Sequence, residues 1–223
     1  MPTNLDSLKN TNVFLLSLDK LSTMKKIILF FLFISFTQAL LASDSKTYFR
    51  ADYGMGRFKS DKLDSLNANP KGSTYGIAFG SKMSYVEVGI FYRNFSFDAD
   101  ITHDSSANQI LHKGNTFGLD LNVFLNNHLS LKIGYAVNNY KQSFANSMSA
   151  SSLSAAKISY GIEDNKSSSN IFYGANVDIF SGKTWDLYTS IIQFPMGDGK
   201  STLTAQVGIR FYMNKSFSYF FGQ

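Results

Sequence analysis

The chain has 223 residues, with 21 Lys and Arg against 16 Asp and Glu for a formal charge of +5, and no cysteine. This length allows one domain or two small ones, and the lack of cysteine excludes a disulfide framework, a thiolate zinc site and a cysteine nucleophile. Aromatic residues make up 15% and charged residues only 17%. Because soluble domains carry about 25% charged residues, this composition favours an unusually aromatic, charge-poor fold.

A short hydrophobic segment near the N-terminus has the layout of a secretory signal peptide. Lys25 and Lys26 follow Met24 and precede an apolar run at residues 27–36. The small residues after the run are Ala39, Ala42 and Ser43. A basic start, a short apolar centre and a small-residue exit are typical of an export signal, and the run is short for a membrane span. An N-terminal anchor helix is the alternative.

We therefore expect translation to start at Met24. Residues 1–23 would be an upstream extension outside the fold, and residues 24–43 a signal peptide cleaved near Ala42 or Ser43. Four cations lie before that cleavage point: Lys9, Lys20, Lys25 and Lys26. The basic excess consequently gives little reason to expect a nucleic-acid partner, which an exported chain would rarely meet.

After this segment, apolar residues recur at every second position in eight stretches. These cover residues 49–56, 74–80, 86–93, 116–125, 129–137, 171–179, 185–191 and 203–211. In residues 129–137, for example, Leu131, Ile133 and Tyr135 alternate with Lys132 and Gly134. Alternation of this kind predicts strands with one apolar face, each close to the length needed to cross a bilayer at a tilt. No later stretch of ten or more residues shows helical periodicity.

The connections between the strands alternate in length. Residues 82–84, 126–128 and 181–183 have the composition of hairpin turns, and the last connection, residues 195–201, is also short. Long connections are expected at residues 60–72, 94–115 and 139–170. In the last of these, a Ser/Ala-rich stretch at 143–156 precedes a predicted strand piece at 157–163, which we expect to extend a hairpin above the membrane. Short turns at one end and long loops at the other are typical of an outer-membrane barrel.

Aromatic residues at the strand ends favour an apolar face that meets lipid. The aromatic girdles are predicted from Tyr75, Tyr92, Phe117 and Tyr173 toward the long loops, and from Phe49, Phe79, Trp185 and Phe211 toward the short turns. Membrane barrels carry aromatic girdles at both interfaces. A soluble lipocalin-like carrier, with the apolar face turned inward, is the competing arrangement.

The opposite face of the strands carries charges and many glycines. The predicted barrel-interior charge network comprises Arg50, Asp52, Glu87, Arg93, Asp120, Lys132, Asp178, Asp186 and Arg210. Four cations and five acids could pair inside a narrow barrel, where an unpaired charge is costly. Phe91, Phe124, Phe172 and Tyr188 would share the interior, so we expect no open channel.

The sequence thus predicts an eight-stranded antiparallel up-and-down transmembrane β-barrel with short periplasmic turns and longer extracellular loops, spanning residues 44–213. A closed barrel leaves no unpaired strand edge in lipid, so the last strand must pair with the first. Residues 214–223, where Phe217, Tyr219 and Phe221 alternate, form a C-terminal tail or extend the last strand.

This pattern resembles the OmpA/OmpX-like small outer-membrane β-barrel superfamily over about residues 46–213. The stretch Tyr48-Phe49-Arg50-Ala51-Asp52-Tyr53-Gly54-Met55-Gly56-Arg57-Phe58 and the seven strands after it carry the resemblance. It implies heat-modifiable surface proteins, adhesins or structural membrane proteins that the barrel assembly machinery inserts. Family members often end on an aromatic residue, whereas here Asn214 to Gln223 follows the Phe211-Tyr212 pair, which leaves the position of that assembly signal open.

Enzymatic chemistry has one candidate site. His103 and Ser105 give the H-x-S spacing that resembles the motif of lipid A deacylases, but no glutamate follows until Glu163, and Asp104 would be only a weak substitute as the orienting acid. A divalent cation could in principle bind Asp98, Asp100, His103 and Asp104, although such a loop is more typical of solvated surface.

We accordingly expect no catalytic site, no metal and no cofactor. The predicted function is a non-enzymatic bacterial outer-membrane surface protein with a structural, adhesive or ligand-contact role through its extracellular loops. The expected partners are outer-membrane lipid and lipopolysaccharide, the assembly machinery and a host or cell-surface ligand, with the barrel as a monomer. A lipid A-modifying enzyme and a soluble lipocalin-like carrier are the alternatives.

Overall fold

The computed structural model describes residues 45–213 of the chain. The predicted upstream extension, the signal peptide with its cleavage point, and residues 214–223 lie outside the described residues and remain predictions. No helix among the described residues is long and apolar enough to cross a membrane.

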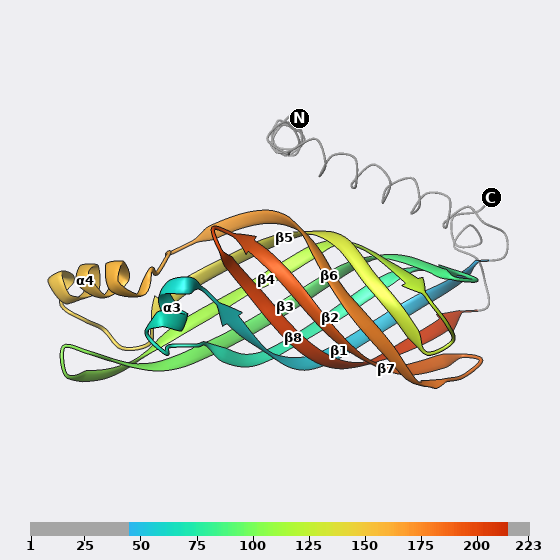
Figure 1. The fold of residues 1–223 in the computed structure, drawn as a ribbon, viewed down its shortest axis with the longest axis horizontal. Coiled ribbons are helices and arrows are strands. Elements are labelled where there is room, and N and C mark those ends of the chain that lie inside the picture. The colour runs from blue at the N-terminus through green and yellow to red at the C-terminus, as the bar shows by residue number, and fades with distance from the viewer. Residues whose placement is uncertain (1–44, 214–223) are drawn as a thin grey trace, which may run out of the picture.

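Eight antiparallel strands close into a single barrel (Figure 1). They are β1 (Lys46–Lys59), β2 (Lys71–Met83), β3 (Val86–His103), β4 (Ser106–Phe124), β5 (Leu129–Phe144), β6 (Lys166–Ser181), β7 (Trp185–Gly197) and β8 (Lys200–Met213). Each strand pairs with its sequence neighbours, and β8 pairs with β1, with Tyr53 opposite Val207. The predicted fold class is confirmed, and every strand edge is paired, as a barrel in lipid requires.

Short turns gather at one end of the barrel and longer connections at the other (Figure 1). The turn end holds the β2–β3, β4–β5 and β6–β7 connections. The loop end holds helix α3 (Asp61–Ser65), the tip of the β3–β4 hairpin, helix α4 (Ala150–Tyr160) and the β7–β8 turn. This asymmetry is the one expected of an outer-membrane barrel, whose turns lie in the periplasm and whose loops lie outside the cell.

The predicted loop at residues 94–115 is wrong, because β3 and β4 continue as a paired ladder up to His103 opposite Ser106. The ladder ends in a two-residue turn at Asp104 and Ser105, whose φ angles are 50° and 62°. Two residues with positive φ make the mirror-type turn that matches strand twist in a hairpin. The second long loop is therefore a β-hairpin that rises above the rest of the barrel.

The predicted strand piece at residues 157–163 is also wrong, since residues 150–160 form helix α4. The helix begins after Ser149, whose hydroxyl accepts a hydrogen bond from the Ser152 amide, and ends at Gly161 with φ of 65°. A serine N-cap and a left-handed glycine are ordinary helix boundaries. Only Ala156 and Tyr160 are buried, so the helix has no apolar stripe whose periodicity could reveal it.

The two faces of the membrane strands lie as the sequence predicts. Ile133 and Val207 are exposed on the outer surface, and Leu121 lies opposite Ile133 on the same face. Arg93, Asp120 and Lys132 are buried. Had the barrel been a soluble carrier, these positions would be reversed, so the geometry contradicts that alternative and is that of a transmembrane barrel.

The interior changes character along the barrel. Toward the turn end it holds the charged side chains, together with the buried aromatic residues Phe91, Phe124, Phe172 and Tyr188. Toward the loop end it holds an apolar group, which we call the loop-end core: Phe58, Leu63, Ala68, Phe95, Phe97, Ile101, Ile110, Tyr140, Ala156, Tyr160, Ile162 and Met196. The loop end is therefore a small folded layer with its own hydrophobic core.

Candidate functional site

The structure places all nine predicted charged side chains inside the barrel, none more than 9% exposed. At one centre of the cluster, Arg50 Nη2 lies 2.6 Å from Asp120 Oδ2, and Lys132 Nζ lies 3.1 Å from the same oxygen. Charge-assisted hydrogen bonds of this length are among the strongest in proteins. They tie β1, β4 and β5 together through the lumen.

The second centre forms around Arg210, which lies directly opposite Arg50 in the β1–β8 register. Two adjacent arginines would repel one another, but Glu87 lies between them. Its Oε2 is 3.0 Å from Arg210 Nε, and its Oε1 is 3.4 Å from Arg50 Nη1. Arg210 Nη1 also lies 3.0 Å from Asp186 and 3.5 Å from Asp178. Each arginine is thus held by carboxylates from other strands.

Two further groups complete the network. Arg93 Nη2 lies 3.6 Å from Asp52 Oδ1 and donates to Gln206 Oε1 at 3.0 Å. Lys82, predicted to lie in a turn, lies on β2 opposite Glu87 and 4.0 Å from Asp186. Continuing the alternation from Gly80 would have placed Lys82 on the inward face. With Lys82 included, every strand contributes at least one charge.

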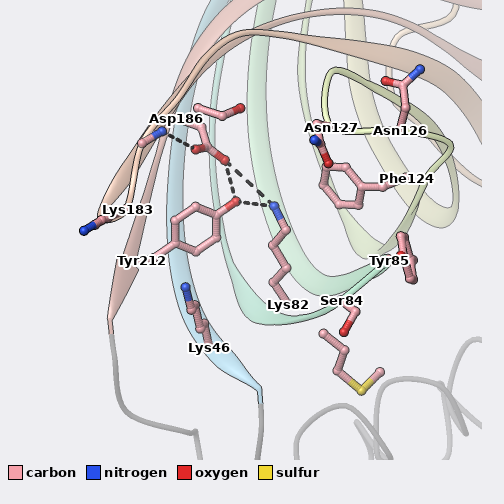
Figure 2. Close-up of a pocket in the computed structure, with 13 residues that line it drawn as sticks. Lys46, Lys82, Ser84, Tyr85, Phe124, Asn126, Asn127, Lys183, Asp186 and Tyr212 are labelled. Atoms are coloured by element: carbon pink, nitrogen blue, oxygen red, sulfur yellow. Dashed lines mark hydrogen bonds and ion pairs between the residues drawn. The ribbon is translucent and has the colours of Figure 1, made fainter.

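The network reaches the turn end, where a cavity of about 390 Å³ opens (Figure 2). Figure 2 shows Tyr212 between Asp186 and Lys82: its hydroxyl donates to Asp186 Oδ2 at 2.6 Å and accepts from Lys82 Nζ at 2.9 Å. Lys82 Nζ also lies 4.2 Å from the centre of the Phe124 ring. Lys82 and Tyr212 therefore close the charge network toward the periplasmic side.

We predict that Arg210→Met lowers the free energy of unfolding by about 3–5 kcal/mol, the usual cost of leaving a buried ion cluster with one partner missing. The change removes the cation that faces Glu87, Asp178 and Asp186. The measurement is urea unfolding in detergent micelles. Lys183→Gln, at an exposed turn lysine, is the control and is expected to shift stability by less than about 0.5 kcal/mol. Equal losses in the two variants would contradict a structural role for the network.

The predicted aromatic girdles lie on the outer surface. Phe49 stands opposite Phe79 on β2 and Phe211 on β8, and Trp185 stands opposite Phe211 on β7. The four rings thus form one continuous row across four strands at the turn end. Toward the loop end, Tyr92 stands opposite Phe117, and Tyr75 and Tyr173 are exposed on β2 and β6.

His112 lies in the loop-end core, five residues beyond the girdle residue Phe117 and outside the membrane span. Its ring stacks on Phe58 with 3.9 Å between centroids and packs against Phe95 and Tyr140. Neither ring nitrogen has a hydrogen-bond partner among the described residues. Burial, with a smaller contribution from the Lys200 charge, lowers the pKa of His112 to about 3. The imidazole is therefore a neutral part of an aromatic stack.

A buried neutral histidine makes stability depend on pH. In the unfolded chain this histidine binds a proton near pH 6.5, but in the folded chain only near pH 3. The free energy of unfolding therefore keeps its full value above pH 6.5 and falls as the pH drops from 6.5 toward 3. We predict that the native protein loses about 2 kcal/mol between pH 7.5 and pH 5, and that His112→Phe loses little. Urea unfolding at the two pH values measures this. Identical losses in both proteins would contradict the assignment.

Helix α4 is bound to its surroundings on three sides. Lys62 Nζ of α3 donates to the Ile158 carbonyl at 3.1 Å, and Tyr160 donates to the Thr102 carbonyl of β3 at 3.1 Å. At the hairpin tip, Ser152 donates to Asp104 Oδ2 at 3.1 Å. These contacts fix α3, α4 and the β3–β4 hairpin to one another.

An ion cluster joins the segment after α4 and the start of β6 to the β7–β8 turn. Glu163 lies 2.6 Å from Lys200 Nζ and 2.9 Å from Lys166 Nζ, and Lys166 also pairs with Asp198. Burial opposes ionisation of Glu163, but hydrogen bonds from Lys200 and Lys166 outweigh it and hold the pKa of that carboxyl below its usual range. The carboxylate therefore stays ionised at neutral pH, and the cluster ties the α4–β6 connection to the β7–β8 turn.

The H-x-S pair lies at the tip of the β3–β4 hairpin, close to the acidic residues of that segment. His103 ends β3, Asp104 and Ser105 form the turn, and the nearest charged partner of His103 is Asp104, with Nε2 3.5 Å from Oδ2. Asp100 Oδ1 accepts from Gln109 Nε2 at 2.8 Å across the hairpin. Among residues 45–213, no group of three or more side chains with metal-ligating geometry is found.

No protein-family model and no curated protein matches the sequence. Several solved structures are similar in fold. The attachment invasion locus protein Ail of Yersinia pestis is 14% identical with a TM-score of 0.47, covering 76% of this chain and 99% of that one. Neisserial surface protein A is 12% identical with a TM-score of 0.43, covering 74% and 96%. The N-terminal β-barrel domain of Pseudomonas aeruginosa OprF is 12% identical with a TM-score of 0.43, covering 75% and 97%.

Similarity this low assigns no function, and the fold rests on the strand pairing itself. The closed pairing of eight strands, the apolar outer surface and the turn–loop asymmetry decide the architecture. The chain is a small eight-stranded outer-membrane β-barrel. Barrels of this architecture span the outer membrane of bacteria, with the loop end outside the cell.

Proposed function

We propose that this barrel is a non-enzymatic surface protein that contacts a host or cell-surface ligand through its loop end. The observation that carries the proposal is the loop-end core, which fixes α3, α4 and the β3–β4 hairpin into one layer above the membrane. Binding functions commonly sit on loops that a rigid scaffold positions. A pre-ordered surface also binds without a large entropic cost of ordering.

The outer face of α4 offers a contact surface of small residues with one large apolar side chain. Ser151, Ser154, Ala155 and Ser159 are exposed on it, and Ile158 is 74% exposed. The carbonyl of Ile158 is held by Lys62, so the side chain is presented from a fixed backbone. A fixed, exposed hydrophobic side chain is suited to insertion into a pocket of a partner.

The other partners follow from the architecture. Outer-membrane lipid and lipopolysaccharide would contact the apolar surface and the aromatic girdles, and the assembly machinery would insert the barrel. The barrel would act as a monomer, since each strand already pairs on both sides.

The test compares cells of a non-adherent bacterium that display the protein with cells that carry an empty vector. We predict that Ile158→Asp reduces binding to an epithelial cell layer by about tenfold, because a charge replaces an apolar anchor. The matched control is Tyr85→Asp at the turn end, since Tyr85 is 71% exposed. An equal effect of both substitutions, or no binding by the native protein, would contradict a contact role for α4.

The lipid A-modifying alternative makes a different prediction. Cells that express the native protein, or His103→Ala, are expected to have the same lipid A mass spectrum as cells with the empty vector. Within residues 45–213, His103 pairs with Asp104, and no hydrogen bond joins it to Ser105 as base and nucleophile. A change in acylation that His103→Ala abolishes would overturn the non-enzymatic proposal.

A further inference from the structure

Two lysines face each other on the outer wall of the barrel, just beyond the aromatic girdle of the loop end. Lys113 of β4 lies directly opposite Lys141 of β5, and both side chains are exposed. Four residues back along the same ladder, the girdle residue Phe117 lies opposite Val137. Four residues of strand correspond to about 13 Å, so the lysine pair lies in the layer of lipid headgroups and sugars.

Like charges directly opposite in a ladder are destabilising unless an anion offsets them. Arg50 and Arg210 face one another inside the barrel, and Glu87 lies between them. Lys46 faces Lys82, and Lys82 has Asp186 at 4.0 Å. The other outward pair, Arg57 and Lys71, has Asp98 opposite Lys71.

The Lys113–Lys141 pair has no such partner. No carboxylate oxygen of residues 45–213 forms an ion pair with either ammonium group. Asp98 is diagonal to Lys113 in the ladder but faces Lys71. Asp164 lines the same surface groove as Lys141, yet its carboxylate is held by Lys157 at 2.7 Å. The chain itself therefore leaves two facing cations uncompensated at headgroup height.

A groove of about 320 Å³ runs beside Lys113 on the outer wall. It is lined by Ser73, Tyr75, Asn94, Phe95, Ser96, Lys113, Gly114 and Asn115. Its lining supplies hydroxyl, amide and phenol groups, with Lys113 as its one charge. Hydroxyls and amides of this kind hydrogen-bond sugar hydroxyls, and an exposed aromatic ring offers an apolar face.

We propose that this site binds a phosphorylated glycolipid of the outer leaflet, with the phosphate between Lys113 and Lys141 and the sugar in the adjacent groove. The inference rests on the proposed outer-membrane setting, with the loop end outside. Tyr75, which lines the groove, is also an exposed girdle residue, so a ligand seated there would have its acyl chains against the barrel wall. That arrangement favours a membrane lipid over a free anion.

The experiment measures binding of purified bisphosphorylated lipid A to the protein folded in uncharged detergent micelles. Lys113→Gln combined with Lys141→Gln is expected to weaken binding by about 10- to 30-fold, the effect of removing two cations near a membrane anion. The matched control is Lys46→Gln with Lys183→Gln, which removes the same charge at the turn end and is expected to change affinity less than about twofold. A heat-dependent gel shift checks that each variant is folded.

Enzymatically dephosphorylated lipid A is the second probe. The native protein should bind it as weakly as the double variant binds intact lipid A, and the double variant should bind both forms alike. A third variant, Lys141→Glu, places an acid opposite Lys113; it should abolish the preference for phosphate while raising stability toward urea. Retained phosphate preference in Lys141→Glu would overturn the proposal.

Three other outcomes would also overturn it. Equal weakening in the two double variants would mean a general charge effect. Displacement of lipid A by equimolar inorganic phosphate would identify a simple anion site, and equally tight, lysine-dependent binding of heparin would identify a polyanion surface. Cell binding separates this inference from the proposed function, since the Lys113/Lys141 double variant is expected to adhere normally and Ile158→Asp to bind lipid A normally.

Discussion

The fold depends on one requirement: the lumen of eight strands must hold buried charges in a way that leaves none unpaired. Glu87 meets this requirement where repulsion would be strongest, because the register brings Arg50 and Arg210 face to face and the Glu87 carboxylate lies between them. Because the carboxylate comes from β3 while the arginines come from β1 and β8, the bridge forms only when the barrel is closed. A slip of one residue would turn these charges toward lipid, so the network helps to specify a single register.

The same physics explains where prediction from sequence succeeds. Inside the membrane span, lipid surrounds the wall and the interior is polar, so the apolar residues of each strand mark its outer face. Leu131, Ile133 and Tyr135 therefore identify β5 and its orientation, and the closure of β8 on β1 follows from the absence of water to satisfy a free edge.

Beyond the girdle, water surrounds the wall and the pattern reverses. Phe95, Phe97 and Ile101 of β3 alternate just as regularly, but they point inward into the loop-end core. If apolar side chains are expected on the outside along the whole strand, the pattern predicts a loop there, although the period of two continues without interruption through the change of phase. Helix α4 escapes detection for another reason: its burial rests on Ala156 and Tyr160 alone, and only its boundaries at Ser149 and Gly161 carry a sequence signal.

This change of phase also means that the turn-end half and the loop-end half of the barrel are stabilised by different interactions. The turn-end half is stabilised by ion pairs in the lumen, some of which, such as Glu87–Arg210, cross it, whereas the loop-end half is stabilised by a hydrophobic core around His112 and Phe58. The loop-end surface can consequently vary without replacing the charges that set the register, because the loop-end core and the charge network consist of different residues. Between the two, the outer wall meets the headgroup layer, where anionic headgroups would offset the facing cations of Lys113 and Lys141.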